Sequence, residues 1–237
     1  DLNNAQDTNL SHLSSFNKDG FTLGADTYQN GNSQTFVAWC WKAGGATTVA
    51  NTDGDQTTQV SVNEEAGFSI VTYTGTGSNT NIGHGLGGTP DIVITKSRSA
   101  SGDWAFLDRI GNSTAEYGLF LNDNGGYSSY QGGTYWNDTL PTSTVFRVSS
   151  SAATNASGVT YMAYCWRSIP GYSKMGTYRG NGSSKGTSVY CGFRPAWLMI
   201  KRVNNSRNWM LFDNKRDIDN PVQTFLEADL TLSLIHI

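Results

Sequence analysis

Apolar and polar residues alternate at period two through most of the chain, which predicts β-strands with one buried and one exposed face. The alternating stretches are short and rich in β-branched and aromatic residues; they are 68–73, 91–96, 104–107, 118–121, 143–148 and 159–166. Turn-forming pairs such as Asp19-Gly20 and Asn181-Gly182 lie between them. Only 221–230 has some helical character, and its apolar positions are too few to define a helix face. We therefore predict an all-β fold.

The chain also repeats itself. Residues 21–41 recur without a gap as 146–166, and residues 72–77 recur as 177–182. The second shift also matches Pro90 with Pro195, Lys96 with Lys201, Trp104 with Trp209 and Asp108 with Asp213. A period of roughly a hundred residues is the size of a small domain. We predict tandem antiparallel β-sandwich modules of lectin-like type, one complete and two partial.

The repeat sets the expected domain organisation, although it fixes the length of a module and not its starting point. The complete module is expected at 67–166, which can hold seven or eight strands, roughly enough for a sandwich core. The end of a preceding module is expected at 1–42 and the start of a following one at 167–231, so we expect a chain cut at both ends. The Gly/Thr/Asn/Asp-rich stretch 43–66 is expected to be a polar linker. Residues 232–237 match the translation of a sequencing adapter and are treated as an artefact.

Composition argues against several classes of partner. Charged residues make up 15 % of the chain and the net charge is −3, so no basic stripe is available for nucleic acid. No apolar run is long enough to cross a bilayer, and membrane insertion is not expected. The three cysteines, without a C-x-x-C, suit neither a zinc site nor a disulfide framework, and no cofactor is expected. Cys40 and Cys165 occupy the same repeat position, which predicts small buried residues.

Enzymatic chemistry is not favoured. Glutamates, which could serve as glycosidase acids, are few: Glu64, Glu65, Glu116 and Glu227. His84 lies in a glycine-rich turn, but Val189 fills the matched position, which favours packing or loop shape over proton transfer. Asp108 and Asp213 recur in register, which favours a turn or strand-end role. The stretch 51–55 could offer oxygen ligands to calcium, but an Asp-Gly turn is the simpler explanation.

The loop 122–138 has the composition of a binding surface. Tyrosine and tryptophan rings stand among Gly, Ser and Asn, a mixture that supplies rigid contact area and adaptable hydrogen bonds. Sugars suit such a loop, because their C–H faces lie on aromatic rings and their hydroxyls reach amides and carboxylates. The candidate ligand-binding residues are Asn124, Tyr127, Tyr130, Tyr135, Trp136 and Asp138. The alternative is that Trp136 and one tyrosine pack onto the end of the sandwich.

Several motifs together resemble an uncharacterised repeat family in virion and tail-fibre-like proteins of marine bacteriophages. They lie at 67–75, 84–90, 141–146, 161–166 and 213–216, and the likeness covers nearly all of 21–219. The resemblance implies a structural or receptor-binding role in a virion, and it brings no catalytic or binding residues with it. More distantly, the strand order is similar to H-type-lectin-like tips of phage fibres, which would imply homotrimers and glycan recognition.

From these observations we expect a bacteriophage tail-fibre or appendage protein that binds a host cell-surface glycan without catalysis. The competing hypothesis is a purely architectural shaft or decoration module of the virion without a ligand. A polysaccharide depolymerase is the third hypothesis. Weak contacts repeated along modules would gain avidity in the first case.

Overall fold

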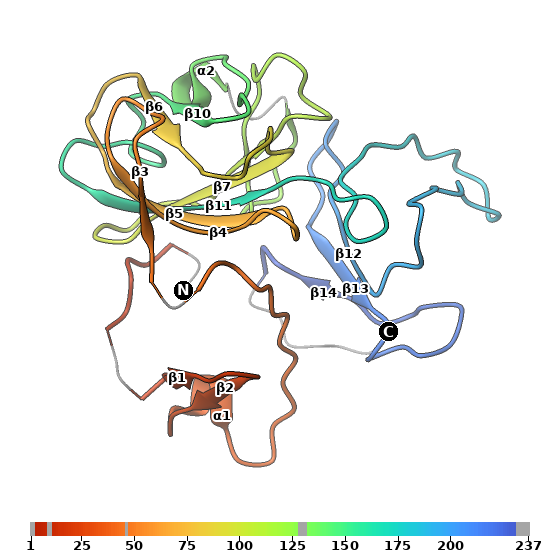
Figure 1. The fold of residues 1–237 in the computed structure, drawn as a ribbon. Coiled ribbons are helices and arrows are strands. Elements are labelled where there is room, and N and C mark those ends of the chain that lie inside the picture. The colour runs from red at the N-terminus through yellow and green to blue at the C-terminus, as the bar shows by residue number, and fades with distance from the viewer. Residues whose placement is uncertain (1–2, 9–10, 46, 128–131, 231–237) are drawn as a thin grey trace. The chain divides into compact units, whose positions relative to one another are not determined.

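The computed structural model describes residues 3–8, 11–45, 47–127 and 132–230, and residues 232–237, expected to be adapter sequence, lie outside that set (Figure 1). The chain divides into two compact units, Gln6–Trp41 in one and Asp1–Ala5 with Lys42–Ile237 in the other. The structure is nearly all β, with several antiparallel sheets, as the alternation predicts. Within the described ranges, no helix is long and apolar enough to cross a membrane.

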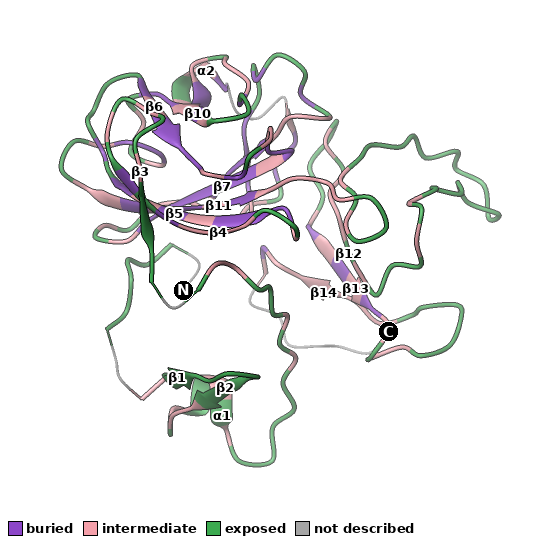
Figure 2. Cartoon of the chain, viewed as in Figure 1, coloured by how far each residue is buried: buried purple, intermediate pink, exposed green. Residues whose placement is uncertain are grey.

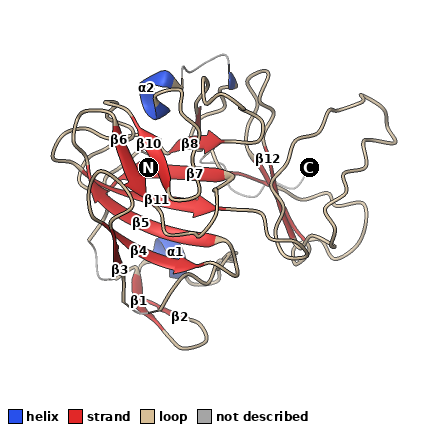
Figure 3. Cartoon of the chain, turned by 45° about the horizontal axis from the view of Figure 1, so that its top comes forward, coloured by secondary structure: helices blue, strands red, loops and turns tan. Residues whose placement is uncertain are grey.

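The larger unit is built on a seven-stranded antiparallel sheet. Its strands follow the order β3 (Val49–Asn51), β4 (Thr58–Asn63), β5 (Phe68–Thr74), β11 (Thr160–Trp166), β7 (Ile92–Ser97), β8 (Ala105–Asp108) and β9 (Leu119–Phe120). A second antiparallel pair, β6 (Thr80–Gly83) with β10 (Val145–Val148), lies over this sheet beside the short helix α2 (Gly133–Trp136) (Figures 1 and 3). The two layers form the all-β sandwich predicted from the sequence.

The core between the layers follows the period-two pattern. In β11, Tyr161, Ala163 and Cys165 are fully buried, while the residues between them are half-buried. Ile82 of β6 and Phe146 of β10 close the core from the other layer. Figure 2 shows the buried residues concentrated where the layers face each other. Burial raises the pKa of the Cys165 thiol to about 12, so this cysteine acts as a small apolar side chain, as predicted.

The segment 43–66 differs from the polar linker predicted for it. It supplies β3 and β4, and β4 pairs with β5 along its length, from Gln59↔Thr72 to Asn63↔Phe68. Thr58 and Val60 are 1 % and 4 % exposed, so alternate residues of β4 face the core. The polar composition was misleading because a strand with one solvated face needs few apolar residues. The module boundaries themselves stay predictions.

A third sheet follows the sandwich, with the order β12 (Trp197–Ile200), β13 (Met210–Asp213) and β14 (Leu226–Glu227). The stretch 221–230 contains β14 and turns rather than a helix. Trp209, the residue before β13, is 2 % exposed, and the centroid of its ring lies 4.7 Å from that of Phe106 on β8. Its Nε1–H donates to the carbonyls of Phe120 and Asp123, at 2.9 and 3.2 Å. One buried side chain thus attaches the third sheet to β8 and β9.

The smaller unit holds a short hairpin and one helical turn. β1 (Leu13–Phe16) pairs with β2 (Phe21–Leu23), and Asp26 caps the N-terminus of α1 (Thr27–Asn30), since its side chain accepts from the Tyr28 N–H. The stretch 36–41, which the repeat matches to β11, has no regular secondary structure. Cys40 is exposed there, so the buried position predicted for it is wrong. A strand is buried only when its neighbours cover it, and among the described residues of this unit no strand pairs with 36–41.

Candidate functional site

Tyr127, in the predicted binding loop, forms a stacked pair with Tyr117, and this pair is here called the tyrosine platform. Their rings are stacked, with centroids 5.4 Å apart and planes inclined by 17°. Tyr117 is 41 % exposed, whereas Tyr127 is half-buried beneath it. An exposed ring backed by a second ring is a rigid apolar surface that loses little entropy when a ligand lies on it.

Asp108, at the end of β8, fixes the orientation of Tyr127. The Tyr127 hydroxyl donates to Oδ2 of Asp108 at 2.8 Å, while Oδ1 accepts from the backbone N–H groups of Ile110 and Gly111. Burial and the neighbouring carboxylate raise the pKa of Tyr127, so the phenol stays protonated and remains a donor. A Cβ on Gly111 would come within 2.5 Å of both the Tyr127 hydroxyl and the Asp108 carboxylate, so a side chain at this position would displace one or both groups.

The start of the predicted binding loop is held by the hairpin between β12 and β13. The Tyr127 N–H donates to the Val203 carbonyl at 2.7 Å, and the Asn124 carbonyl accepts from the Arg207 N–H at 2.9 Å. Lys201 Nζ also donates to the Asn124 carbonyl, at 2.8 Å, and lies 5.7 Å from the Trp209 ring centroid. Burial lowers the pKa of Lys201, and nearby carboxylates oppose that shift. The backbone carrying Tyr127 is therefore anchored from two sides.

The structure describes five of the six predicted binding residues and does not bring them together in one site. Tyr127 belongs to the platform, and Asn124 is exposed three residues before it. Trp136 is fully buried in α2 as part of the sandwich core, and Tyr135 is half-buried with its ring against the edge of Phe120. The full burial of Trp136 fits the alternative, in which this ring packs onto the sandwich, whereas a ligand contact at Tyr135 stays a prediction.

Of the remaining two predicted residues, the structure describes Asp138. Asp138 is exposed, in a left-handed backbone conformation with φ of 46°. Tyr130 lies outside the described residues. Tyr117 was missed by the sequence analysis, because a single tyrosine just before the strand stretch 118–121 gives no periodic signal. Its pairing with Tyr127 becomes visible only once β8, β9 and their turns are placed.

His84 has the structural role that the repeat favours. It is fully buried; its Nδ1 accepts from the Leu86 N–H, and its Nε2–H donates to the Thr142 carbonyl, both at 3.2 Å. Burial lowers the pKa of His84, which keeps the ring neutral and this tautomer in place. The side chain shapes the turn between β6 and β7.

Asp213 reproduces the turn geometry of Asp108. Its Oδ1 accepts from the N–H groups two and three residues later, on Lys215 and Arg216, as Oδ1 of Asp108 does in its own turn. Its Oδ2 accepts from Arg216 Nε at 2.7 Å. The recurrence of these aspartates therefore reflects turn formation, as predicted.

The candidate calcium stretch 51–55 is likewise used in local bonds. Asn51 Nδ2 donates to Asp53 Oδ2 at 2.7 Å, and Asp55 Oδ2 accepts from the Asn81 N–H at 2.7 Å. Among the described residues, no group of three or more His, Cys, Asp or Glu side chains is placed to hold a metal ion. The stretch thus behaves as a turn.

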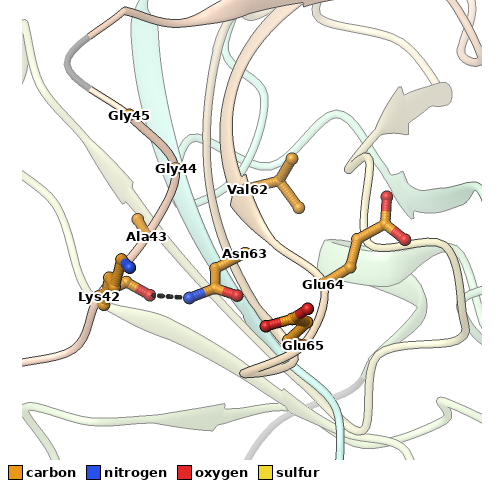
Figure 4. Close-up of a pocket in the computed structure, with 8 residues that line it drawn as sticks. All are labelled: Lys42, Ala43, Gly44, Gly45, Val62, Asn63, Glu64 and Glu65. Atoms are coloured by element: carbon orange, nitrogen blue, oxygen red, sulfur yellow. Dashed lines mark hydrogen bonds between the residues drawn. The ribbon is translucent and has the colours of Figure 1, made fainter.

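A hollow of about 560 Å³ lies beside β4 (Figure 4). Asn63 Nδ2 donates to the Lys42 carbonyl at 3.2 Å and closes one side of it. The lining residues are Lys42, Ala43, Gly44, Gly45, Val62, Asn63, Glu64 and Glu65. It offers charged and amide groups but no aromatic ring, so it lacks the flat apolar surface on which a sugar could stack. The tyrosine platform is the stronger candidate site.

The chain was compared with known proteins. No curated protein and no solved structure matches it. A family model described as a domain of unknown function matches residues 1–233, and the chain therefore belongs to the DUF7483 family.

Proposed function

We propose that this protein is a structural component of a bacteriophage tail fibre or appendage that binds host cell-surface glycans without catalysis. The tyrosine platform carries the proposal: an exposed Tyr117 ring is stacked on Tyr127, which Asp108 holds in place. A sugar ring lies with its C–H face on Tyr117 and directs hydroxyls to polar groups such as Asn124. The stacking and the bond to Asp108 hold the Tyr127 ring in one orientation, which reduces the entropic cost of association.

The chemistry around the platform supports binding rather than bond cleavage. A glycosidase needs one carboxyl group free to donate a proton and a second free to act as base or nucleophile. Asp108 accepts two backbone N–H groups and the Tyr127 hydroxyl, so both of its carboxylate oxygens are used in local hydrogen bonds. Its roles here are turn formation and ring orientation.

The phage assignment comes from the resemblance of the sequence motifs to marine phage virion repeats. Tandem modules, or a homotrimer, would place several tyrosine platforms on one particle. Several weak sites that bind together gain affinity without a new contact, provided that their spacing matches the host surface. Under this proposal the protein acts outside the host cell as part of the virion.

A glycan array probed with the full chain tests the proposal. We expect binding to envelope polysaccharides and at least a tenfold loss of affinity, about 1.4 kcal/mol, in Tyr117→Ala. Tyr172→Ala is the matched control, because Tyr172 is 55 % exposed and lies outside the platform. No binding by the wild-type chain, or equal loss in both variants, would refute the proposal.

A purely architectural module is the second candidate. It is favoured by the bonds that tie the loop backbone at Asn124 and Tyr127 to 203–207, because they give the loop a packing role inside the chain. In that case Tyr117→Ala leaves adsorption of virions to host cells unchanged, and the wild-type chain binds none of the glycans.

A further inference from the structure

Charge is distributed unevenly along the chain. Residues 139–212 contain no Asp or Glu, although the net charge of the whole chain is −3. Within this acid-free stretch, part of the connection between β11 and β12 carries four cationic side chains, Lys174, Arg179, Lys185 and Arg194. The part 174–194 is here called the cationic segment. An anion that meets it finds positive charge without carboxylates from the same segment competing for that charge.

The cationic segment is open to solvent. All four cationic residues are exposed, and Figure 2 shows most of the ribbon between β11 and β12 as exposed. In the part of the chain that the structure describes, none of the four forms an ion pair. Four glycines of the segment have open space around them, because a Cβ on any of them would meet no atom beyond its chain neighbours within 4 Å; they are Gly180, Gly182, Gly186 and Gly192. The segment thus has both free cations and room for a ligand.

A hydrogen-bonded loop carries two of the four cations. Thr187 Oγ1 donates to the Arg179 carbonyl at 2.9 Å, which brings the two ends of this loop together. Inside the loop, Asn181 Nδ2 donates to the Gly186 carbonyl at 2.7 Å. Arg179 and Lys185 are therefore presented by one small loop whose backbone is held by its own side chains.

The sequence repeat indicates that the four cations do not serve the fold. The shift that matches 72–77 with 177–182 places uncharged hydroxyl residues opposite all four; they are Ser69, Thr74, Thr80 and Thr89. The sandwich builds β5, β6 and the turn that follows β6 with these hydroxyl residues. A charge needed for packing or turn formation should occur in both copies. The positive charges therefore point to a role in binding.

Two exposed tyrosines lie among the cations. Tyr178 is 50 % exposed and Tyr190 is 91 % exposed. The repeat counterpart of Tyr178 is Tyr73, which is buried in the sandwich core, and that of Tyr190 is Gly85. Aromatic rings offer apolar area to the C–H faces of sugars, while Arg and Lys pair with carboxylates through charge-assisted hydrogen bonds. The cationic segment combines both kinds of contact.

We propose that the cationic segment binds a carboxylate-bearing polysaccharide. Consecutive cations of the segment are five, six and nine positions apart, and no two are adjacent. Patches that bind nucleic acid concentrate Lys and Arg in runs of about 5–8 residues, because DNA carries one charge per roughly 1.7 Å of its axis. An acidic polysaccharide carries its carboxylates more sparsely, commonly one per repeating unit. Widely spaced cations with intervening tyrosines suit that polymer better than a nucleic acid.

This site is separate from the tyrosine platform. The inference rests on the proposed function only for the source of the polymer, the host envelope. Binding of the polymer by the cationic segment requires neither Tyr117 nor Tyr127. The two sites also differ in ligand class, because the cationic segment requires a carboxylate and the platform requires a sugar ring.

Isothermal titration of the full chain with hyaluronan tests the proposal, since this polymer has one carboxylate per disaccharide. Carboxyl-reduced hyaluronan is the matched polymer without charge. The wild-type chain should bind hyaluronan at least about tenfold more tightly than the reduced polymer, because several exposed ion pairs form together. Added salt should weaken the binding of hyaluronan, because it screens exposed charges.

A pair of charge variants locates the site. Arg179→Thr combined with Lys185→Thr introduces the residue type that the sandwich copy has at both positions, and it should weaken hyaluronan binding about fivefold. Lys18→Thr combined with Lys215→Thr removes the same charge at exposed positions outside the segment, and its affinity should stay within about twofold of the wild type. All four side chains are exposed, so neither variant should disturb folding.

Tyr117→Ala distinguishes this proposal from binding at the platform. It should leave hyaluronan affinity unchanged, whatever its effect on the glycan array. The proposal is overturned if the wild-type chain binds no hyaluronan, if it binds the carboxyl-reduced polymer equally well, or if both charge variants lose affinity equally. Loss of hyaluronan binding in Tyr117→Ala, or tighter binding of single-stranded oligothymidylate than of hyaluronan, would also overturn it.

Discussion

Replacing Trp209 by alanine should remove the main attachment of the third sheet to the sandwich. The side chain is 2 % exposed, its ring packs on Phe106, and its Nε1–H donates to two carbonyls. Truncating a buried tryptophan costs about 3–5 kcal/mol through lost burial and the cavity left behind. The lost hydrogen bond contributes about 1 kcal/mol of that total, since both carbonyls lose a donor.

Trp104 is the matched control, because the repeat places it at the same position as Trp209 but it is only half-buried. Trp104→Ala should cost about 1–2 kcal/mol, in proportion to the smaller apolar area removed from the protein interior. Trp209→Phe should fall between the two alanine variants, because it keeps the ring contact with Phe106 and loses the donor.

Urea unfolding followed by far-ultraviolet circular dichroism measures these differences without relying on tryptophan emission. With a slope of about 3 kcal/mol per molar urea, Trp209→Ala should lower the midpoint by about 1–1.7 M and Trp104→Ala by about half a molar. Equal midpoints for the two alanine variants would refute the structural reasoning. So would a loss below about 0.5 kcal/mol for Trp209→Ala, the size of an ordinary surface substitution.

Three further predictions concern single groups. Because burial lowers the pKa of His84, the stability that this residue contributes should be complete above the unfolded pKa of about 6.5 and be lost as the pH falls through the folded pKa. The free energy of unfolding of His84→Gln should therefore depend less on pH than that of the wild type between about pH 7.5 and 5. Parallel plots of unfolding free energy against pH for the two proteins would contradict this. Gly111→Ala should break the hydrogen bond between the Tyr127 hydroxyl and Asp108, destabilise the protein by about 1–3 kcal/mol and weaken glycan binding. An unchanged melting temperature together with unchanged glycan affinity would count against the geometry of this turn. A thiol reagent should modify Cys40 quickly in the native protein, whereas Cys165 should react only after the protein unfolds, because its thiol is buried and has a pKa of about 12. Rapid reaction of Cys165 in the native protein would contradict its position in the core.

The fold was predictable where the sequence carries periodic information. Alternation in β5 and β11 predicted strands whose alternate residues are buried, and the repeat predicted that Asp108 and Asp213 form turns; β7 was predicted as a strand too, but it is buried on both faces. A two-residue side-chain period is a local property, so the sequence records it directly. The sandwich follows because a sheet made of such strands has one apolar face, and a second layer must cover that face to keep it from water.

The errors arose where tertiary context decides. β4 was taken for linker because only alternate positions such as Val60 need to be apolar when one face stays in solvent. Trp136 was taken for a ligand contact because the segment 122–138 around it has the composition of a binding loop. In the structure, the helical turn α2 directs the Trp136 side chain into the core. Cys40 and Cys165 share a sequence position but not a burial state, since only Cys165 lies on a strand with neighbours on both sides. Composition alone does not distinguish these outcomes.

Hydrogen–deuterium exchange of the full chain, with and without polysaccharide from the envelope of a host bacterium, tests the central claim most directly. Binding on the tyrosine platform should slow amide exchange in the described residues 108–127, and Tyr117→Ala should abolish the effect. Protection confined to the hollow lined by residues 42–45 and 62–65, or no protection at saturating polysaccharide, would contradict the account.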